Sequence, residues 1–257
     1  MHDFLAKFMP PNYAEHGFEL DRLSAYVHWL MLLLFIAWGS LFVYMLFRFR
    51  ASRNKKASYT GATTHASSYA EAGVAVVEVI LLVGFSIPAW YKWTSRPAAS
   101  TNPAEIRVVA EQFAWNIQYP GADNRFGRTD VKLVSSSNPL GIDPADPYAK
   151  DDIATINQLH LQVNRPVIIR LSSKDVIHSF FLPQMRVKQD AIPGMEIPVH
   201  FTPIKAIEEG EKWEIACAQL CGLGHYRMKG MYFVHTKENL AKWMTNEVPY
   251  VTSVTGG

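Results

Sequence analysis

The stretch VHWLMLLLFIAWGSLFVYMLF, from Val27 to Phe47, decides the architecture of the first third of this 257-residue chain. It contains no Lys, Arg, Asp or Glu over its 21 residues. At a rise of about 1.5 Å per residue, such a helix matches a hydrocarbon layer about 30 Å thick. Trp29 and Tyr44 lie near its two ends, where aromatic rings favour the membrane–water interface. The stretch therefore predicts a membrane span.

A block of cations follows this span and predicts its orientation. Between residues 48 and 56 the chain carries Arg48, Arg50, Arg53, Lys55 and Lys56 with no acidic residue. By the positive-inside rule, this block lies in the cytoplasm and the N-terminus lies outside. A secretory signal peptide fits less well, because its cations would precede the apolar run.

A second apolar stretch runs from Ala72 to Tyr91 and holds Glu78 as its only charge. We therefore expect residues 1–94 to form a transmembrane helical hairpin with spans of about 27–47 and 71–92. Two buried helices of a soluble protein are the less favoured alternative, because such helices rarely run so long without charge. A carboxylate near mid-membrane costs about 2.5–3.5 kcal/mol, so Glu78 indicates either a proton path or a packing residue that is protonated or hydrogen-bonded.

Residues 95–257 have a different pattern, in which short β-rich runs alternate with Pro and Gly turn signals. This pattern predicts an all-β domain, either a sandwich or a Greek-key barrel, on the outer side of the membrane. The expected strands are Ile106–Val109, Trp115–Tyr119, Leu159–Val163, Val167–Leu171, Ile197–Phe201, Trp213–Ala216 and Met231–Thr236. We also expect a surface loop over Val134–Asp152, a short helix over Lys237–Asn246 and a loose tail from Val251 to Gly257.

The overall charge excludes one class of partner. With 25 Lys and Arg against 23 Asp and Glu, the formal net charge is +2. A dedicated nucleic-acid binder would have a clear basic excess, so no nucleic-acid partner is expected.

The segment from Cys217 to Met228, CAQLCGLGHYRM, carries the chemistry. It places two cysteines, His225 and Met228 in a C-x3-C-x3-H-x2-M pattern, and thiolate, imidazole and thioether donors select copper over hard cations. His178, in an apolar context 39 residues before Cys217, is the candidate second imidazole. A disulfide would leave His225 and Met228 unexplained, and zinc would not use methionine. His160, His200 and His235 lack such support and are expected to be structural.

These features together resemble subunit II of haem–copper cytochrome c oxidase, copper A type. The resemblance rests on the hairpin, His178, the stretch Lys188–Gly194 and the Cys217–Met228 loop, and it covers nearly the whole chain. It implies a cupredoxin-like Greek-key sandwich with a binuclear copper A centre. This centre would take electrons from cytochrome c and pass them to haem in subunit I, where O2 reduction is coupled to proton translocation. No catalytic residue is therefore expected in this chain.

By residue match, the resemblance also implies a ligand set. Cys217 and Cys221 would bridge two coppers, and His178 and His225 would be the terminal imidazoles. Met228 would be a weak ligand of one copper, and the backbone carbonyl of Gln219 a weak ligand of the other.

Three positions depart from the family pattern or are ambiguous in it. Gln219 replaces a glutamate whose carboxylate reaches Mg or Mn at the subunit I border, so a weakened or absent Mg/Mn site is expected, although Asp190 matches a nearby acidic position. Phe113 replaces a tryptophan linked to electron entry, which leaves Phe113 or Trp115 as candidates. For the mouth of a proton channel, Glu71 fits better than Glu78.

The resemblance further implies partners and a location. Expected partners are subunit I, other oxidase subunits, cytochrome c and membrane lipid. The chain is expected in a bacterial cytoplasmic membrane with its copper domain on the periplasmic side, and the mitochondrial inner membrane is less favoured. Two alternatives remain: a membrane-tethered copper carrier, and a copper-free quinol oxidase subunit, which intact copper ligands disfavour.

Overall fold

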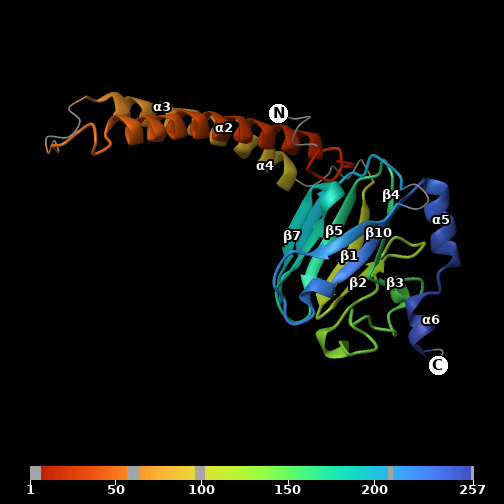
Figure 1. The fold of residues 1–257 in the computed structure, drawn as a ribbon. Coiled ribbons are helices and arrows are strands. Elements are labelled where there is room, and N and C mark those ends of the chain that lie inside the picture. Colours follow the sequence, from red (N-terminus) through yellow and green to blue (C-terminus); the bar gives the residue numbers. More distant parts are fainter. Residues whose placement is uncertain (1–6, 57–58, 60–63, 96–101, 208–210, 256–257) are drawn as a thin grey trace. The chain divides into compact units, whose positions relative to one another are not determined.

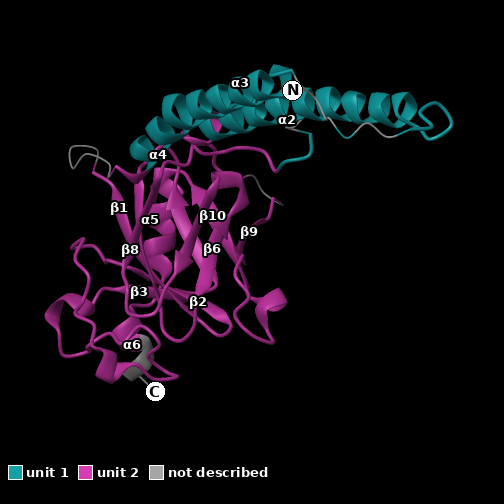
Figure 2. Cartoon of the chain, turned by 90° about the vertical axis from the view of Figure 1, so that its left-hand side faces the viewer, with its two compact units in different colours: residues 1–9, 19–93 teal, residues 10–18, 94–257 magenta. Residues whose placement is uncertain are grey.

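A computed structural model describes residues 7–56, 59, 64–95, 102–207 and 211–255. The chain divides into two compact units (Figure 2). One contains Met1–Met9 with Glu19–Trp93, and the other contains Pro10–Phe18 with Thr94–Gly257. The first unit is helical and the second is built on β-strands.

In its described residues, the helical unit contains two long helical segments, each apolar enough to cross a membrane. The first is α2, Gly17–Arg48, which begins with an acidic residue in its first turn and ends on a basic one. That charge order suits the helix dipole. The second segment runs from Ala66 to Thr94 as α3 (Ala66–Leu81), η1 (Leu82–Ser86) and α4 (Ile87–Thr94). The two expected N-terminal helices are thus confirmed.

The segment η1 is a π-helical turn inside the second helix, which the sequence pattern did not indicate. Pro88 has no N–H, so it cannot donate to the carbonyl four residues earlier, and its ring crowds that carbonyl. The hydroxyl of Ser86 donates to the Leu81 carbonyl at 3.2 Å. The widened turn therefore lies just ahead of the proline that disturbs regular α-helical bonding.

The second unit is a sandwich of two five-stranded sheets in the described part of the chain (Figure 1). One sheet has the order β3-β2-β1-β5-β8 and the other β4-β10-β9-β6-β7. The strands are β1 (Ala104–Glu111), β2 (Ala114–Tyr119), β3 (Ile153–Ile156), β4 (Gln158–Gln162), β5 (Val167–Ser173), β6 (His178–Leu182), β7 (Val187–Ala191), β8 (Ile197–Phe201), β9 (Trp213–Cys217) and β10 (Lys229–His235).

Pairing within both sheets is mixed. β1 runs parallel to β5 and β4 runs parallel to β10, while the other neighbours are antiparallel. Half of the neighbouring pairs are not consecutive in sequence, so connections cross between the sheets, as in Greek-key folds. The predicted cupredoxin-like sandwich is confirmed.

The hydrophobic core lies between the two sheets. Burial alternates along β5, where Val167, Ile169 and Leu171 point inward. Trp115 and Phe180 are among the largest fully buried side chains. Such close-packed interiors resist local rearrangement, so the core forms a firm base for the loops at its end.

Several local expectations can be compared with the structure. The helix over Lys237–Asn246 is present as α5, whereas β3, β6 and β7 were not anticipated. The tail was expected to be loose, but α6 (Tyr250–Thr255) is helical. Tyr250 explains this difference, because its N–H donates to the Asp152 carbonyl at 2.7 Å and its hydroxyl to the Ser137 carbonyl at 2.9 Å.

The N-terminal segment ahead of α2 packs on the β-domain, which the sequence did not indicate. The Tyr13 N–H donates to the Gln184 carbonyl at 2.8 Å, and the Ile204 N–H donates to the Tyr13 carbonyl at 2.9 Å. The Tyr13 ring stacks on Trp213 with centroids 4.8 Å apart. Residues 10–18, which run from ahead of α2 into its first two residues, therefore form part of the second unit.

Asp152 gives this domain a testable pH dependence. It is fully buried, and its Oδ2 accepts from Gln118 Nε2 at 2.6 Å and from the Gly127 N–H at 2.9 Å. Burial raises the pKa of Asp152 from 3.8 to about 6. Between these two pKa values the folded chain keeps a proton that the unfolded chain loses. The free energy of unfolding therefore falls as the pH rises from about 4 to about 6.

We expect Asp152→Asn to stabilise the protein above pH 6 and to flatten this pH dependence. The gain should be about 1–2 kcal/mol, because one pKa unit corresponds to about 1.4 kcal/mol and part of the shift is offset by the hydrogen bonds that asparagine loses. Unfolding of the full chain in detergent, followed from pH 4 to 8, measures this. Asp123→Asn, at an exposed position, is the control. Identical pH profiles for Asp152→Asn and the unaltered chain would contradict the expectation.

Candidate metal centre

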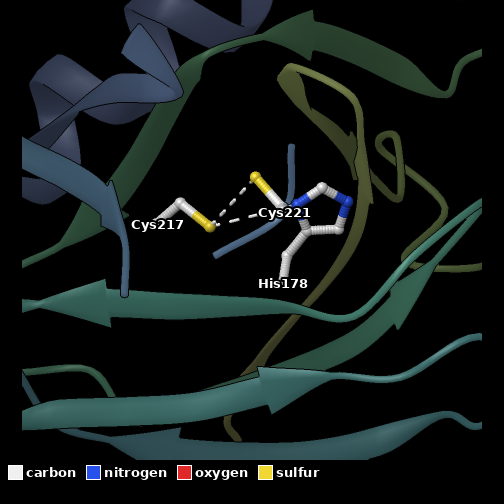
Figure 3. A group of neighbouring side chains, drawn as sticks. All are labelled: His178, Cys217 and Cys221. Atoms are coloured by element: carbon white, nitrogen blue, oxygen red, sulfur yellow. Dashed lines mark hydrogen bonds between the residues drawn. The ribbon is translucent and has the colours of Figure 1, made fainter. Parts of the chain in front are cut away.

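Strand pairing brings together residues that lie far apart in sequence. His178 is the first residue of β6, and Cys217 is the last residue of β9. These strands are antiparallel neighbours in one sheet, with Phe180 opposite Cys217. The Ala218 N–H also donates to the Ser179 carbonyl at 2.9 Å. The imidazole therefore reaches the thiols although 39 residues separate His178 from Cys217 (Figure 3).

The loop after β9 folds tightly because its ends are joined and its glycines allow close approach. The Cys217 N–H donates to the Met228 carbonyl at 3.3 Å, just before β10 begins. Gly222 has φ +133°, a left-handed region that favours glycine. A Cβ on Gly224 would lie 2.4 Å from the Phe113 ring, so only glycine fits beneath it.

Two thiols and His178 form the centre of the cluster. The Sγ atoms of Cys217 and Cys221 are 3.8 Å apart, and His178 Nδ1 is 3.9 Å from Cys217 Sγ. One ligand atom from each of these three residues lies within 4.8 Å of the others. In Figure 3 the imidazole and both sulfur atoms converge on one space. The backbone carbonyl of Gln219 lies 3.2 Å from Cys217 Sγ.

The other two ligand candidates join the same cluster. His225 Nδ1 is 3.6 Å from Cys221 Sγ, and Met228 Sδ is 3.7 Å from the same sulfur. His225 opens the short 3₁₀ turn His225–Arg227, whose end places Met228 just before β10. The structure thus brings together all six positions that the sequence singled out as ligands.

The donor set fits copper. Both cysteines are free thiols, with sulfurs much further apart than the about 2.05 Å of a disulfide. Two thiols between two imidazoles, with a thioether beside them, are soft ligands that suit copper and not Mg²⁺ or Ca²⁺. Methionine is no usual zinc ligand. In the described ranges, no other group of three His, Cys, Asp or Glu side chains could hold a metal.

Burial affects the protonation of the Cys221 thiol. Cys221 is 4% exposed, and burial, together with the neighbouring Cys217 thiol, raises the pKa of Cys221 to about 11. Metal binding needs the thiolate, so a metal ion must displace this proton.

Asp175 binds the ring nitrogen of His178 that faces away from the cysteines, and the sequence analysis did not identify this role. Asp175 Oδ1 lies 2.9 Å from His178 Nε2 and accepts a hydrogen bond from it, which leaves the lone pair of Nδ1 directed at the cysteines. The Gln112 N–H donates to Asp175 Oδ2 at 2.7 Å, and the Val176 N–H donates to Oδ1 at 2.7 Å. Burial acts to raise the pKa of Asp175, but hydrogen bonds from His178 and the two amides outweigh it and lower the pKa. The only signal in the sequence was an acid three residues before His178.

Two aromatic candidates differ in their access to the surface. Phe113 is 37% exposed and lies against Gly224 of the loop. Trp115 is completely buried, with its ring centroid 6.2 Å from that of His178. Gln112, next to Phe113 in the chain, donates from Nε2 to the Cys221 carbonyl at 2.6 Å. Phe113 can therefore contact a docked protein, and Trp115 cannot.

The remaining candidates lie outside this cluster. Asp190 is exposed on β7, opposite Ser179. Glu71 and Glu78 are exposed on α3 and, seven residues apart, share one helix face. His160 Nδ1 and His235 Nε2 form their own contact at 2.9 Å, apart from the thiols.

Comparison with known proteins places the chain in a family. The family model described as cytochrome c oxidase subunit II, periplasmic domain, matches residues 105–232. The alternative cytochrome c oxidase subunit 2 of Bradyrhizobium diazoefficiens is 31% identical over 248 residues, which cover 96% of this chain and 86% of that protein. The chain belongs to the cytochrome c oxidase subunit II family.

Other members of the family show the same relation. Cytochrome c oxidase subunit 2 of Cereibacter sphaeroides is 28% identical over 252 residues, covering 89% of this chain and 78% of that protein. The solved periplasmic domain of the Bradyrhizobium japonicum oxidase subunit II is 26% identical, with a TM-score of 0.39 over 55% of this chain and 91% of that domain. The family assignment expected from the sequence is confirmed, and the matched range contains all six ligand candidates.

Proposed function

We propose that this chain is the electron-entry subunit of a respiratory haem–copper oxidase. In this role it receives electrons from cytochrome c at a copper A centre and delivers them to haem in subunit I, which reduces O2 to water with proton translocation. The observation that carries the proposal is the convergence of His178, Cys217 and Cys221 within 4.8 Å at one end of the sandwich.

The residues of this chain would hold a binuclear copper centre in defined roles. Cys217 and Cys221 would bridge, His178 and His225 would bind through Nδ1, and Met228 would be a weak ligand. The backbone carbonyl of Gln219 would be the remaining weak ligand. When bound, such a centre accepts and releases one electron at a time.

The fold holds the side chains of these candidate ligands in position. Each donor is on a strand end or a short loop tied by backbone hydrogen bonds, and Asp175 sets the tautomer of His178. Because the ligands sit on a close-packed core, little can move when the charge of the site changes.

Two other functions fit less well. A copper-delivery protein needs an exposed, exchangeable site, whereas His178, Cys221 and Met228 are buried. A copper-free quinol oxidase subunit would not need two free thiols aligned with two imidazoles. A single, readily removed copper per chain would favour the delivery role.

Detergent extraction from the native membrane followed by purification tests the proposal. We expect a haem-bearing partner to co-purify, two coppers per chain, and a purple mixed-valence visible spectrum. The absence of copper on this polypeptide in the intact complex would overturn the assignment. The same metal analysis tests the expected loss of Mg or Mn, since Gln219 offers a neutral amide where a carboxylate would bind more strongly.

The proposal extends to location. We propose that residues 1–94 anchor the chain in a bacterial cytoplasmic membrane, with residues 95–257 on the periplasmic side. The positive block after Phe47 supports this orientation. In this arrangement the hairpin contacts lipid and subunit I, and the outer domain meets cytochrome c.

Phe113 is the proposed contact for the electron donor. We expect Phe113→Ala to slow electron entry from cytochrome c by about ten-fold, because a partly exposed aromatic ring beside the metal loop is a typical interface anchor. Stopped-flow oxidation of cytochrome c by the whole oxidase measures this rate. Phe126→Ala serves as the control for loss of an aromatic ring. An unchanged entry rate in Phe113→Ala would remove any role for this position.

Glu71 is the proposed mouth of a proton channel, with Glu78 two helical turns further along the same helix face. We expect Glu71→Gln to lower turnover and proton pumping about ten-fold, since an amide cannot exchange the proton. Reconstituted oxidase vesicles report both quantities, and Glu15→Gln, at an exposed carboxylate ahead of the first helix, is the control. Unaltered turnover and pumping in Glu71→Gln would end this role.

A further inference from the structure

The helical unit contains a groove between its two long helices, and none of its lining residues belongs to the metal cluster. Its volume is about 310 Å³, within the range of small-ligand pockets. On α2 it is lined by Glu19, Arg22, Leu23 and Tyr26, which share one helix face.

The mouth of the groove is charged. Lys92 Nζ pairs with Glu19 Oε1 at 2.5 Å, which joins the two helices, and both side chains stay largely exposed. Arg22 lines the groove one helical turn from Glu19. Two cations and one acid leave a net positive charge at the end of the hairpin where cationic side chains sit at headgroup level.

The floor of the groove is apolar and open. Tyr26 meets Phe85 edge to face, with ring centroids 5.6 Å apart. A Cβ on Gly84 would meet nothing within 4 Å, so the missing side chain keeps the groove hollow. Gly84 and Phe85 lie in the π-helical turn Leu82–Ser86, and such turns occur frequently at functional sites. Pro88 and Ala89 continue the apolar wall.

We propose that this groove binds an anionic phospholipid of the outer leaflet. The phosphate lies between Arg22 and Lys92, and the first carbons of the acyl chains lie against Tyr26, Gly84 and Phe85. The change from a cationic mouth to an apolar floor matches an amphiphile, and the net positive charge selects an anionic headgroup over a zwitterionic one. This inference rests on the proposed placement of the hairpin in a membrane.

Two variants test the two halves of the groove. Arg22→Gln removes a cation from the mouth, and Gly84→Leu fills the floor. The whole oxidase is purified, delipidated and reconstituted in nanodiscs of mixed phosphatidylcholine and phosphatidylglycerol, and retained lipid is counted by native mass spectrometry. We expect one retained phosphatidylglycerol per chain, about five-fold weaker retention in Arg22→Gln, and loss in Gly84→Leu.

Matched controls change the same residue types elsewhere in the hairpin. Arg53→Gln removes a cation from the opposite end, and Gly73→Leu adds the same side chain where a Cβ also meets nothing within 4 Å. Both should retain phosphatidylglycerol as the unaltered oxidase does. Equal retention in all four variants, equal retention of phosphatidylcholine, or a side chain of another subunit filling the groove in the complex would overturn the proposal.

Failure of the lipid site can be separated from failure of the proposed function. Copper content and haem co-purification are measured on the same samples. Intact copper and haem with no retained lipid would reject only the groove. Release of the chain from membranes by alkaline carbonate would instead reject the membrane placement on which the groove depends.

Discussion

Replacing Cys221 by serine is expected to abolish electron entry and reduce bound copper from two per chain to at most one. Cys221 Sγ is within 4 Å of Cys217 Sγ, His225 Nδ1 and Met228 Sδ, so it joins both halves of the ligand set. A hydroxyl is a harder and far less acidic donor than a thiol and does not bridge soft metal ions. The rate of electron entry should fall by more than about 100-fold, which exceeds the effect of removing a residue that only supports a ligand.

Metal analysis, the visible spectrum and cytochrome c oxidation by the purified oxidase measure this effect together. Ala218→Ser is the matched control, because it adds the same hydroxyl at an exposed position beside Cys217 and removes no thiol. It should keep both coppers. If Cys221→Ser kept two coppers and the purple spectrum, the bridging role would be wrong.

Replacing Asp175 by asparagine should give the second-largest effect, although Asp175 is not a ligand. Its carboxylate accepts from His178 Nε2 and from the Gln112 and Val176 amides. An asparagine cannot accept on both sides, so either the His178 contact or the Gln112 contact is lost. Outer-shell partners of this kind change metal affinity by about 10–100-fold.

Copper affinity by competition with a chelator and the reduction potential of the site both report on this change. Glu214→Gln is the control, because its carboxylate pairs with exposed Lys229 and contacts no ligand candidate. A purely structural role for Asp175 would lower thermal stability and leave affinity and potential unchanged. That outcome would contradict the positioning role.

The sequence alone determined the features that depend on local pattern. A charge-free run from Val27 to Phe47 can only be accommodated as a long apolar helix, and the ligand spacing from Cys217 to Met228 is a property of one short segment. The helix over Lys237–Asn246 was also predictable, because Thr236 caps it by accepting from the Asn239 N–H. These signals need no knowledge of distant residues.

Strands and turns that depend on distant partners could not be predicted in this way. β6 begins with three consecutive buried residues, so it lacks the alternation that marks a half-exposed strand. α6 was expected to be loose, because its anchors at Asp152 and Ser137 are about a hundred residues earlier in the chain. The packing of Tyr13 on Trp213 likewise joins opposite ends of the sequence.

The same division applies to the site. The identity of the ligands was readable from residue types and spacing, since donor softness is a property of single side chains. Their geometry, the support of His178 by Asp175, and the difference between exposed Phe113 and buried Trp115 came only from the folded chain. Strand pairing brings together segments that are far apart in sequence, and the burial of a side chain depends on the residues that pack against it. Neither the geometry of the site nor the burial of its residues can therefore be predicted from a single segment.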